Sequence, residues 1–362
     1  MKIQKVTVEV LETPVQLEYV AANHAVSNNY HVLVRIRAEG GVEGIGFVIN
    51  TRVAMIKSLA HMVDELGQLL VGMDARNIDA CMARLTQAGD WLGPGGMLCV
   101  ALSPLDVALW DIRGKLQNLP LYQILGGQRD RVPTYASDAM WFSMTVDELV
   151  RSAQYHVSKG FDKLKLRLGR EATPAAEVHR VRAVRDAVGP DVQIMVDIAE
   201  TWSFHQAVAG GRALQEAGVI WLEDPIDHQN VAGLAHIAAT LDMPLAAGEH
   251  LYGVAPFVHT FDARAVDIAI IDLARAGGIT PWLKIAAIAD AKGIPVAGHV
   301  MPDVHVHLLS AAPNGHWVEY LPRSEVIFKT PLKVEKGCLV APSAPGLGVE
   351  LDEAACVRYR RA

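Results

Sequence analysis

The chain of 362 residues has few cysteines, no long uncharged apolar run and no cluster of basic residues. Its four cysteines, Cys81, Cys99, Cys338 and Cys356, lack the close spacing of a zinc site, so we expect reduced, buried thiols in a cytosolic protein. No run of about 18 uncharged apolar residues is present, which argues against a membrane-spanning helix. The sequence therefore predicts a protein of the cytoplasm that does not use the membrane as a partner.

Acidic residues outnumber basic ones, 40 to 33, and the formal net charge is −7. Without a basic cluster, a nucleic-acid partner is not expected. Residues 1–9 alternate like a strand and carry too much charge for a signal peptide. A small carboxylate substrate is still compatible with this charge, because a bound divalent cation reverses the local field.

The apolar fraction of 51% and the mean hydropathy of +0.20 are typical of a large buried core. The length favours two domains. Over residues 1–128, strands are expected at 6–10, 31–38 and 44–48, and helices at 54–70, 78–85 and 98–116. This order indicates an α+β domain. Residues 19–30 show no clear period, so we expect a loop, either an active-site lid or a disordered segment.

From residue 129 to about 325, short apolar runs alternate with amphipathic helical stretches such as 174–188 and 204–217. The expected strands are 132–136, 163–168, 193–196, 219–222, 244–247, 268–271, 294–297 and 317–319. Buried strands that alternate with helices predict a (β/α) barrel, in which strand ends meet at one mouth. Residues 326–362 are expected to form an irregular tail that packs back onto the first domain.

Three carboxylates recur at the ends of consecutive expected strands. Asp197, Glu223 and Glu249 are spaced 26 residues apart, about the length of one βα unit. One acidic residue after a strand is ordinarily a helix cap. Three that converge at one barrel mouth would repel each other without a cation, and oxygen ligands favour Mg²⁺. These residues are therefore the candidate metal ligands.

Further polar residues follow the later strands. Asp272 and His299 end consecutive strands, so a hydrogen bond between them is expected to fix the imidazole tautomer and raise its basicity. A lone histidine is more often structural, but this pair faces three carboxylates, so catalysis is favoured. Glu319 ends the last strand and would reach the same mouth.

The second barrel strand carries cations on one face. Period-two alternation places Lys163, Lys165 and Arg167 together, facing the barrel interior. Buried cations need anionic partners, and the metal carboxylates and a substrate carboxylate are the obvious ones. The alternative, an exposed edge strand, does not fit the second strand of a closed barrel.

These residues resemble the mandelate racemase subgroup of the enolase superfamily over essentially the whole length. The motifs that carry the resemblance are residues 101–115 with 125–127, 221–225, 247–249 and 272–279. By this resemblance, Asp197, Glu223 and Glu249 bind Mg²⁺, Asp272 and His299 form an acid/base dyad, and Glu319 hydrogen-bonds the substrate carboxylate. The family also implies homo-oligomers. Residues 19–30 would be a specificity loop of the capping domain, with His24 and Asn28, together with Lys163, as candidate substrate contacts.

The chain departs from the family pattern in two places. The subgroup usually has Lys-x-Lys on the second strand, whereas this chain has Lys165 and Arg167 there. Arginine cannot give up its proton at working pH. The subgroup also often has Asn two residues after the first metal ligand, where this chain has Ala199.

The chemistry implied by the family is abstraction of the proton α to a carboxylate, with a metal-stabilised enediolate. A racemase needs an acid/base group on both faces, whereas one histidine can serve a dehydratase. Because Arg167 is a poor base, dehydration of a sugar acid is favoured. A racemase, epimerase or cycloisomerase is the alternative, and a non-catalytic barrel used for binding is a third possibility.

Overall fold

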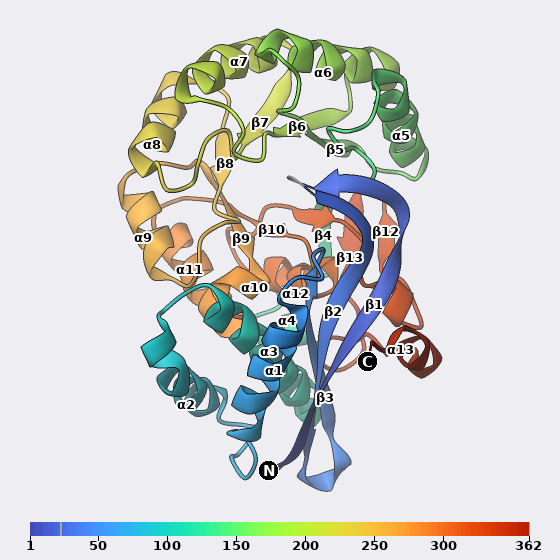
Figure 1. Ribbon diagram of the computed structural model, residues 1–362, viewed down its shortest axis with the longest axis vertical. Coiled ribbons are helices and arrows are strands. Elements are labelled where there is room, and N and C mark those ends of the chain that lie inside the picture. Colours follow the sequence, from blue (N-terminus) through green and yellow to red (C-terminus); the bar gives the residue numbers. More distant parts are fainter. Residues whose placement is uncertain (22–23, 362) are drawn as a thin grey trace.

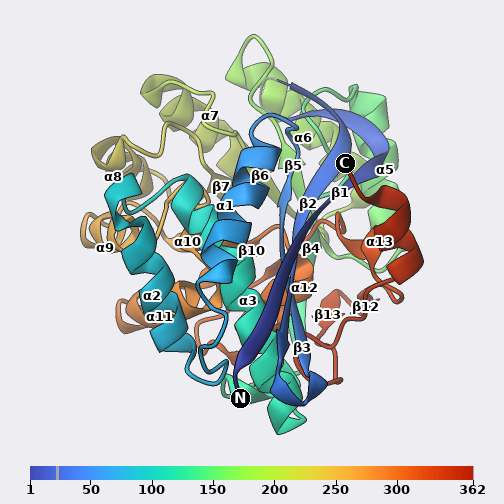
Figure 2. The same ribbon diagram turned by 60° about the horizontal axis from the view of Figure 1, so that its bottom comes forward.

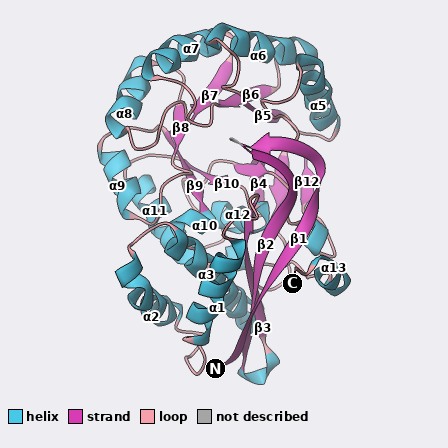
Figure 3. Ribbon diagram, viewed as in Figure 1, coloured by secondary structure: helices cyan, strands magenta, loops and turns pink. Residues whose placement is uncertain are grey.

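The computed structural model describes residues 1–21 and 24–361, and it has two parts (Figure 1). One part is a capping sheet with helices, which contains the N-terminus. The other is a ring of strands with helices on its outer side, as the colouring in Figure 3 shows. The expected (β/α) barrel with an α+β cap is therefore confirmed.

The cap is built on an antiparallel sheet in the order β1-β2-β3. Its elements are β1 (Ile3–Ala21), β2 (His24–Ala38), β3 (Glu43–Asn50), α1 (Ile56–Gln68), α2 (Ile78–Gly89), α3 (Met97–Gln117) and α4 (Leu121–Ile124), with short 3₁₀ helices at Glu39–Gly41 and Asp90–Leu92. Helix α1 buries Leu59, Val63 and Leu66, a spacing that gives one apolar face toward the cap core. Strand β3 lies very close to α3, because a Cβ at Gly46 would stand 2.0 Å from the carbonyl oxygen of Pro104.

The barrel strands pair in parallel in chain order. They are β4 (Arg131–Ala136), β5 (Lys163–Arg167), β6 (Gln193–Asp197), β7 (Val219–Glu223), β8 (Leu245–Ala247), β9 (Ile268–Asp272), β10 (Val296–His299) and β11 (Val318–Tyr320). Strand β11 pairs with β4, and the backbone of His316 donates to Val296 O, so the ring closes between the last strand and β10. All eight expected strands are present, with ends that shift by up to two residues.

Helices cover the outside of the barrel. They are α5 (Val146–Ser158), α6 (Pro174–Val188), α7 (Phe204–Glu216), α8 (Val231–Thr240), α9 (Ala255–Asp262), α10 (Leu273–Ala276), α11 (Ile279–Ala291) and α12 (Pro302–Ala311). Helices α5 and α7 begin with complete capping boxes, Thr145 with Glu148 and Ser203 with Gln206. These caps fix where each strand-to-helix loop ends, and the loops carry the polar residues at the barrel mouth.

The barrel interior is filled by large side chains. Tyr135, Met195 and Trp221 are fully buried there and belong to one apolar cluster with alanine and isoleucine residues of the later strands. The rings of Tyr135 and Trp221 meet edge to face at 5.4 Å. The cluster forms a packed floor, so polar chemistry is confined to the strand ends above it.

The chain ends beside the cap, as Figure 2 shows. After a 3₁₀ turn (Glu325–Ile327) come β12 (Lys333–Glu335), β13 (Cys338–Val340) and α13 (Glu353–Tyr359). Strand β13 pairs antiparallel with β4 on the barrel, whereas Glu353 forms an ion pair with Arg35 of the cap. The divisions after residues 128 and 325 stay predictions.

The expected loop at residues 19–30 is wrong in its secondary structure. Residues 19–21 end β1 and residues 24–30 begin β2, and the two strands pair from Ile3 with Ala38 to Ala21 with His24. The middle of this segment, residues 22–23, lies outside the described residues. Sequence polarity did not reveal the hairpin because its strands are joined by backbone hydrogen bonds, which require no side-chain period.

None of the helices in residues 1–21 and 24–361 has the length and apolar character that crossing a membrane requires.

Candidate active site

The three candidate metal ligands lie together at the carboxyl ends of neighbouring strands. Asp197 ends β6, Glu223 ends β7, and Glu249 follows β8 by two residues. One oxygen of each carboxylate lies within 4.8 Å of the other two. Glu223 is fully buried, and burial raises its pKa to about 8, although the nearby Lys165 ammonium opposes that rise. Glu249 Oε2 is buried and has no hydrogen bond. Glu223 accepts from Lys165 and Trp221, and Asp197 accepts from the backbone of Ala199. Three converging carboxylates, one of them with an unsatisfied oxygen, fit a divalent cation such as Mg²⁺.

Lys165 lies directly among these carboxylates. Its ammonium nitrogen is 2.6 Å from Glu223 Oε1, 3.1 Å from Glu319 Oε1 and 3.9 Å from Asp197 Oδ2. The side chain is fully buried. Burial opposes the charge, but the surrounding carboxylates outweigh it and raise the pKa of Lys165. Lys165 is therefore a cation in this arrangement.

Arg167 lies at the end of β5, one side-chain layer above Lys165. Its Nη1 donates to Ser137 O and Ser137 Oγ at 2.7 Å each, and its Nη2 donates to Glu319 Oε1 at 2.8 Å. The guanidinium also lies 4.5 Å from the ring centroid of Trp141. Burial disfavours its charge, but Glu319 and Asp197 more than compensate and raise the pKa of Arg167. Arg167 is a fixed charge and cannot act as a base.

Asp272 and His299 form the expected pair on adjacent strands. They are register partners on β9 and β10, and His299 Nδ1 is 2.7 Å from Asp272 Oδ2. The other oxygen of Asp272 accepts from the backbone N–H of Arg275 at 2.7 Å. His299 Nε2 points to the carboxylate cluster and lies 3.2 Å from Glu249 Oε2. The imidazole is thus held on one side and presented to the cluster on the other.

Glu319 is fully buried, and protein donors occupy both of its oxygens. Oε1 accepts from Ser137 Oγ at 2.6 Å, as well as from Lys165 and Arg167, and Oε2 accepts from the backbone N–H of Val300 at 2.7 Å. In this arrangement Glu319 anchors the two cations. Its expected contact with a substrate carboxylate stays a prediction.

The structure does not bring Lys163 to this group. Lys163 lies at the opposite end of β5, where its ammonium contacts Asp162 at 2.7 Å and the ring of Trp317 at 5.8 Å. Period-two alternation predicts on which face of a strand a side chain lies, but not how far along the barrel axis it lies. Residues two positions apart on a strand are separated by roughly 6.6 Å. We therefore withdraw Lys163 as a substrate contact.

The candidate contacts from the cap are only partly placed. His24 Nε2 lies 3.2 Å from Thr51 Oγ1, within the cap, and Asn28 is the register partner of Pro14. Tyr19 of the same segment reaches the barrel, where its ring stacks on Trp141 at 3.9 Å with an interplanar angle of 6°. Roles of His24 and Asn28 toward a substrate stay predictions.

Sequence reasoning missed several residues of the site. Ser137 directly follows β4, so the strand-end rule that found the carboxylates could have found it. Arg275 lies in the motif at residues 272–279, which carries the family resemblance, but no role was predicted for it from the sequence. Nothing in the local sequence indicated Trp141, because its position depends on the cap.

Comparison with protein-family models decides the family. Residues 3–126 match the mandelate racemase / muconate lactonizing enzyme N-terminal domain, and residues 148–355 match the enolase C-terminal domain-like model. The chain belongs to the mandelate racemase subgroup of the enolase superfamily. The resemblance read from the sequence is thereby confirmed.

Within this family, the relatives include lyases and isomerases. The chain is 33% identical over 324 residues to L-talarate/galactarate dehydratase of Salmonella typhimurium, covering 90% of this chain and 81% of the relative. It is 29% identical over 353 residues to 3,6-anhydro-alpha-L-galactonate cycloisomerase of Streptomyces coelicolor, covering 97% of each. The crystal structure of L-talarate dehydratase from Polaromonas sp. JS666, complexed with Mg and L-glucarate, superposes with a TM-score of 0.92 at 30% identity, covering all of this chain and 98% of that one. Dehydration and isomerisation, the two reaction classes predicted from the sequence, both occur among these relatives.

Proposed function

We propose that this member of the mandelate racemase subgroup is a Mg²⁺-dependent dehydratase of a sugar acid. Asp197, Glu223 and Glu249 would hold the cation. When bound, the cation supplies a fixed positive charge that stabilises the enediolate formed from an α-hydroxy carboxylate. The observation that carries the proposal is the asymmetry of the site. A hydrogen-bonded Asp272–His299 dyad faces the cluster from one side, and the position of the second family lysine is held by Arg167.

In the proposed reaction, His299 Nε2 takes the proton on the carbon next to the substrate carboxylate. The imidazolium that forms is stabilised by Asp272 at Nδ1. The same imidazolium then gives this proton to the hydroxyl on the next carbon, whose C–O bond breaks, and water leaves. The enol that remains ketonises to a 2-keto-3-deoxy acid. One histidine therefore serves both steps on one face.

Arg167 would act as a fixed cation beside the substrate. Its guanidinium lies between Glu319 and Asp197, with Nε 3.6 Å from Asp197 Oδ2. It can compensate the charge of a substrate carboxylate or bind a hydroxyl, but it cannot accept a proton. Isomerisation is the second candidate, because Lys165 lies in the cluster and would supply a second base if it became neutral.

Isotope exchange separates these two candidates. Wild-type protein in D₂O is expected to exchange the α proton of only one epimer of each responsive sugar acid, because only His299 acts as a base. Arg167→Lys restores the usual family pair and is expected to open exchange in the other epimer. Proton NMR of both epimers, over a library of acid sugars, measures this.

The matched control is Arg167→Met, which removes the guanidinium charge without providing a base. It is expected to leave the second epimer unexchanged. Equal exchange of both epimers by the wild type would mean that a base acts on the Lys165 side, and the protein would then be a racemase or epimerase.

The described part of segment 19–30 is proposed to set specificity by closing the barrel mouth. Tyr19 stacks on Trp141, which contacts Arg167, and the hydroxyl of Tyr19 accepts from Arg323 Nη2 at 2.8 Å. The cap is thereby coupled to a cation of the site through two aromatic rings.

Loss of this stack should weaken substrate binding. An aromatic pair contributes up to about 1.5 kcal/mol beyond its buried area, so Tyr19→Ala is expected to raise KM about tenfold. Tyr19→Phe keeps the stack and loses only the hydroxyl, so its KM should stay within about threefold of wild type. Steady-state kinetics on the best substrate of the library tests this. An unchanged KM for Tyr19→Ala would remove the hairpin from substrate binding.

Cytoplasmic location and assembly into a homo-oligomer remain part of this proposal. Trp91 is 94% exposed and Leu92 is 70% exposed on the 3₁₀ helix Asp90–Leu92, and we propose that these two side chains contact another subunit. Light scattering coupled to size-exclusion chromatography tests the oligomeric state.

A further inference from the structure

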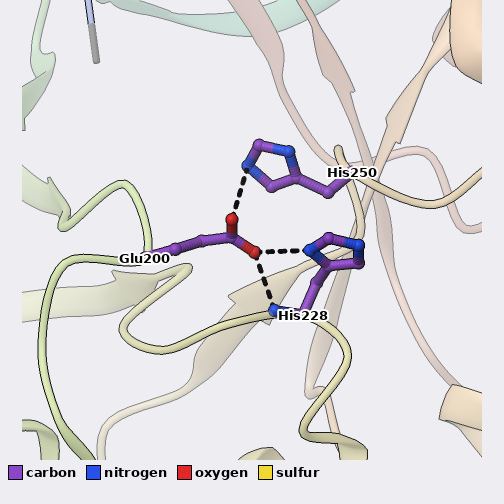
Figure 4. Close-up of side chains that lie close together, drawn as sticks. All are labelled: Glu200, His228 and His250. Carbon is purple, nitrogen blue, oxygen red and sulfur yellow. Dashed lines mark hydrogen bonds and ion pairs between the residues drawn. The ribbon is translucent and has the colours of Figure 1, made fainter. Parts of the chain in front are cut away.

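Arg275 connects three parts of the site that lie on different strand ends. Its backbone N–H donates to Asp272 Oδ1 at 2.7 Å. Its Nη1 lies 2.8 Å from Glu249 O, to which it donates, and 2.6 Å from His250 Nδ1. His250 follows the third metal ligand directly, and Figure 4 shows its ring beside Glu200 and His228.

The contact with Arg275 fixes the protonation of the His250 ring. A guanidinium has only N–H donors and no acceptor. His250 Nδ1 must therefore accept a hydrogen bond with its lone pair, so it carries no proton. The ring is then the neutral tautomer with its proton on Nε2, because a charged imidazole would have donors at both nitrogens.

The Nε2–H group of His250 faces three carboxylates. Its nitrogen is 3.5 Å from Glu249 Oε1, 3.6 Å from Asp224 Oδ2 and 3.8 Å from Glu200 Oε2. Asp224 is only 2% exposed, and its Oδ2 has no hydrogen bond. One N–H donor therefore lies among three carboxylate oxygens, of which Asp224 Oδ2 lacks any other donor and Glu249 Oε1 is the nearest.

Glu200, His228 and His250 are also close enough to surround a second metal ion. The tautomer argues against that interpretation, since a protonated Nε2 has no lone pair for a metal. In addition, Glu200 Oε1 already accepts from both the backbone N–H of His228 and its Nδ1, at 2.7 Å each. The cluster in Figure 4 is better explained as support for the neighbouring carboxylates.

We infer that His250, with its tautomer set by Arg275, is a positioning residue for Glu249. Its Nε2 lies 3.5 Å from Glu249 Oε1 and attracts that oxygen, so that Oε2, which lies 3.2 Å from His299 Nε2, is the oxygen that would face the cation. This inference rests on the proposed function, because it concerns the third carboxylate of the metal cluster. It adds that Arg275 positions both the metal cluster, through His250 and the Glu249 carbonyl, and the dyad, through Asp272.

Two amide substitutions separate the two nitrogens of His250. The amide nitrogen of Gln occupies about the position of Nε2 and can donate to Glu249. The amide of Asn occupies about the position of Nδ1, where it can face Arg275 but cannot reach Glu249. His250→Gln is therefore expected to bind Mg²⁺ within about threefold of wild type. His250→Asn is expected to bind at least about tenfold more weakly, as for other groups that orient metal ligands.

Mg²⁺ affinity of the full-length protein is measured by titration calorimetry, and Mn²⁺ affinity by electron paramagnetic resonance. Thermal midpoints of both variants show whether they fold. Equal affinity of wild type and the Asn variant, or equal loss in both folded variants, would overturn the inference. Absence of metal binding by the wild type would instead overturn the proposed function.

A measurement on the unsubstituted protein tests the tautomer of His250 directly. Ring ¹⁵N NMR signals of His250, assigned by their absence in the Gln variant, are expected to show an unprotonated Nδ1 and a protonated Nε2. A proton on Nδ1 would contradict the role of Arg275, and with it the positioning of Glu249.

Discussion

Glu223→Gln is expected to abolish turnover and divalent-metal binding together. Glu223 is the fully buried member of the carboxylate cluster, and an amide offers one neutral oxygen in place of a charged group. Metal-ion stabilisation of developing negative charge amounts to several kcal/mol, so the loss of rate should be at least about 10³-fold. The substitution also removes the negative charge nearest to the Lys165 ammonium, which lies 2.6 Å from Glu223 Oε1.

The matched control is Glu216→Gln at the end of α7, where the carboxylate is exposed and precedes the start of β7, at the opposite end of that strand from Glu223. It should keep wild-type rates and Mg²⁺ affinity. Excess chelator should stop the wild-type enzyme, and added Mg²⁺ should restore it. Rates are followed by the keto product, and affinity is followed by calorimetry. Full turnover in excess chelator would contradict the metal assignment.

Sequence patterns located the strand ends well because burial constrains them. A strand covered on both faces is a short apolar run, and the first polar residue marks its carboxyl end. Asp197, Glu223 and Asp272 each occupy such a position, and each ends its strand in the structure. The meeting of these residues follows from the closed barrel, so the carboxylate cluster could be predicted from the sequence.

The position of a side chain along the barrel axis and its hydrogen-bond partners could not be predicted in the same way. Lys163 and Lys165 share one face of β5, yet only Lys165 is among the carboxylates, because the layer of Tyr135 and Trp221 fills the barrel below it. Glu319 lies on the last strand as expected, but its saturation depends on three side-chain donors, Ser137, Lys165 and Arg167, and on the backbone N–H of Val300. Such contacts are tertiary and have no local pattern.

The cap contributes the part of the site that local sequence describes least. The stack of Tyr19 on Trp141 joins residues more than 120 positions apart. Neither residue lies in a segment whose hydrophobic period would predict contact with the other. The hairpin is long because β1 and β2 pair from Ile3 with Ala38 to Ala21 with His24, where a loop was expected from residue 19 onward.

The dyad gives the second large effect. His299→Asn is expected to lower kcat by about 10³-fold or more, since general acid–base catalysis contributes roughly 10²- to 10⁴-fold and here one imidazole serves both steps. His179→Asn, a change of an exposed histidine on α6, is the control and should leave kcat unchanged. Exchange of the α proton in D₂O should disappear in parallel with turnover. Wild-type rates for the His299 variant would exclude the dyad from the mechanism.

Asp272→Asn is expected to reduce kcat less than His299→Asn and to change its pH dependence. Burial lowers the pKa of His299, but the carboxylates of Glu249 and Asp272 outweigh burial, and the pKa is raised overall. The base must be neutral, so activity falls as the pH drops through this pKa. Removing the Asp272 charge lowers the pKa, and the acidic limb of the pH–rate profile should move to lower pH. A limb that stays in place, or moves to higher pH, would mean that Asp272 does not act through the imidazole of His299.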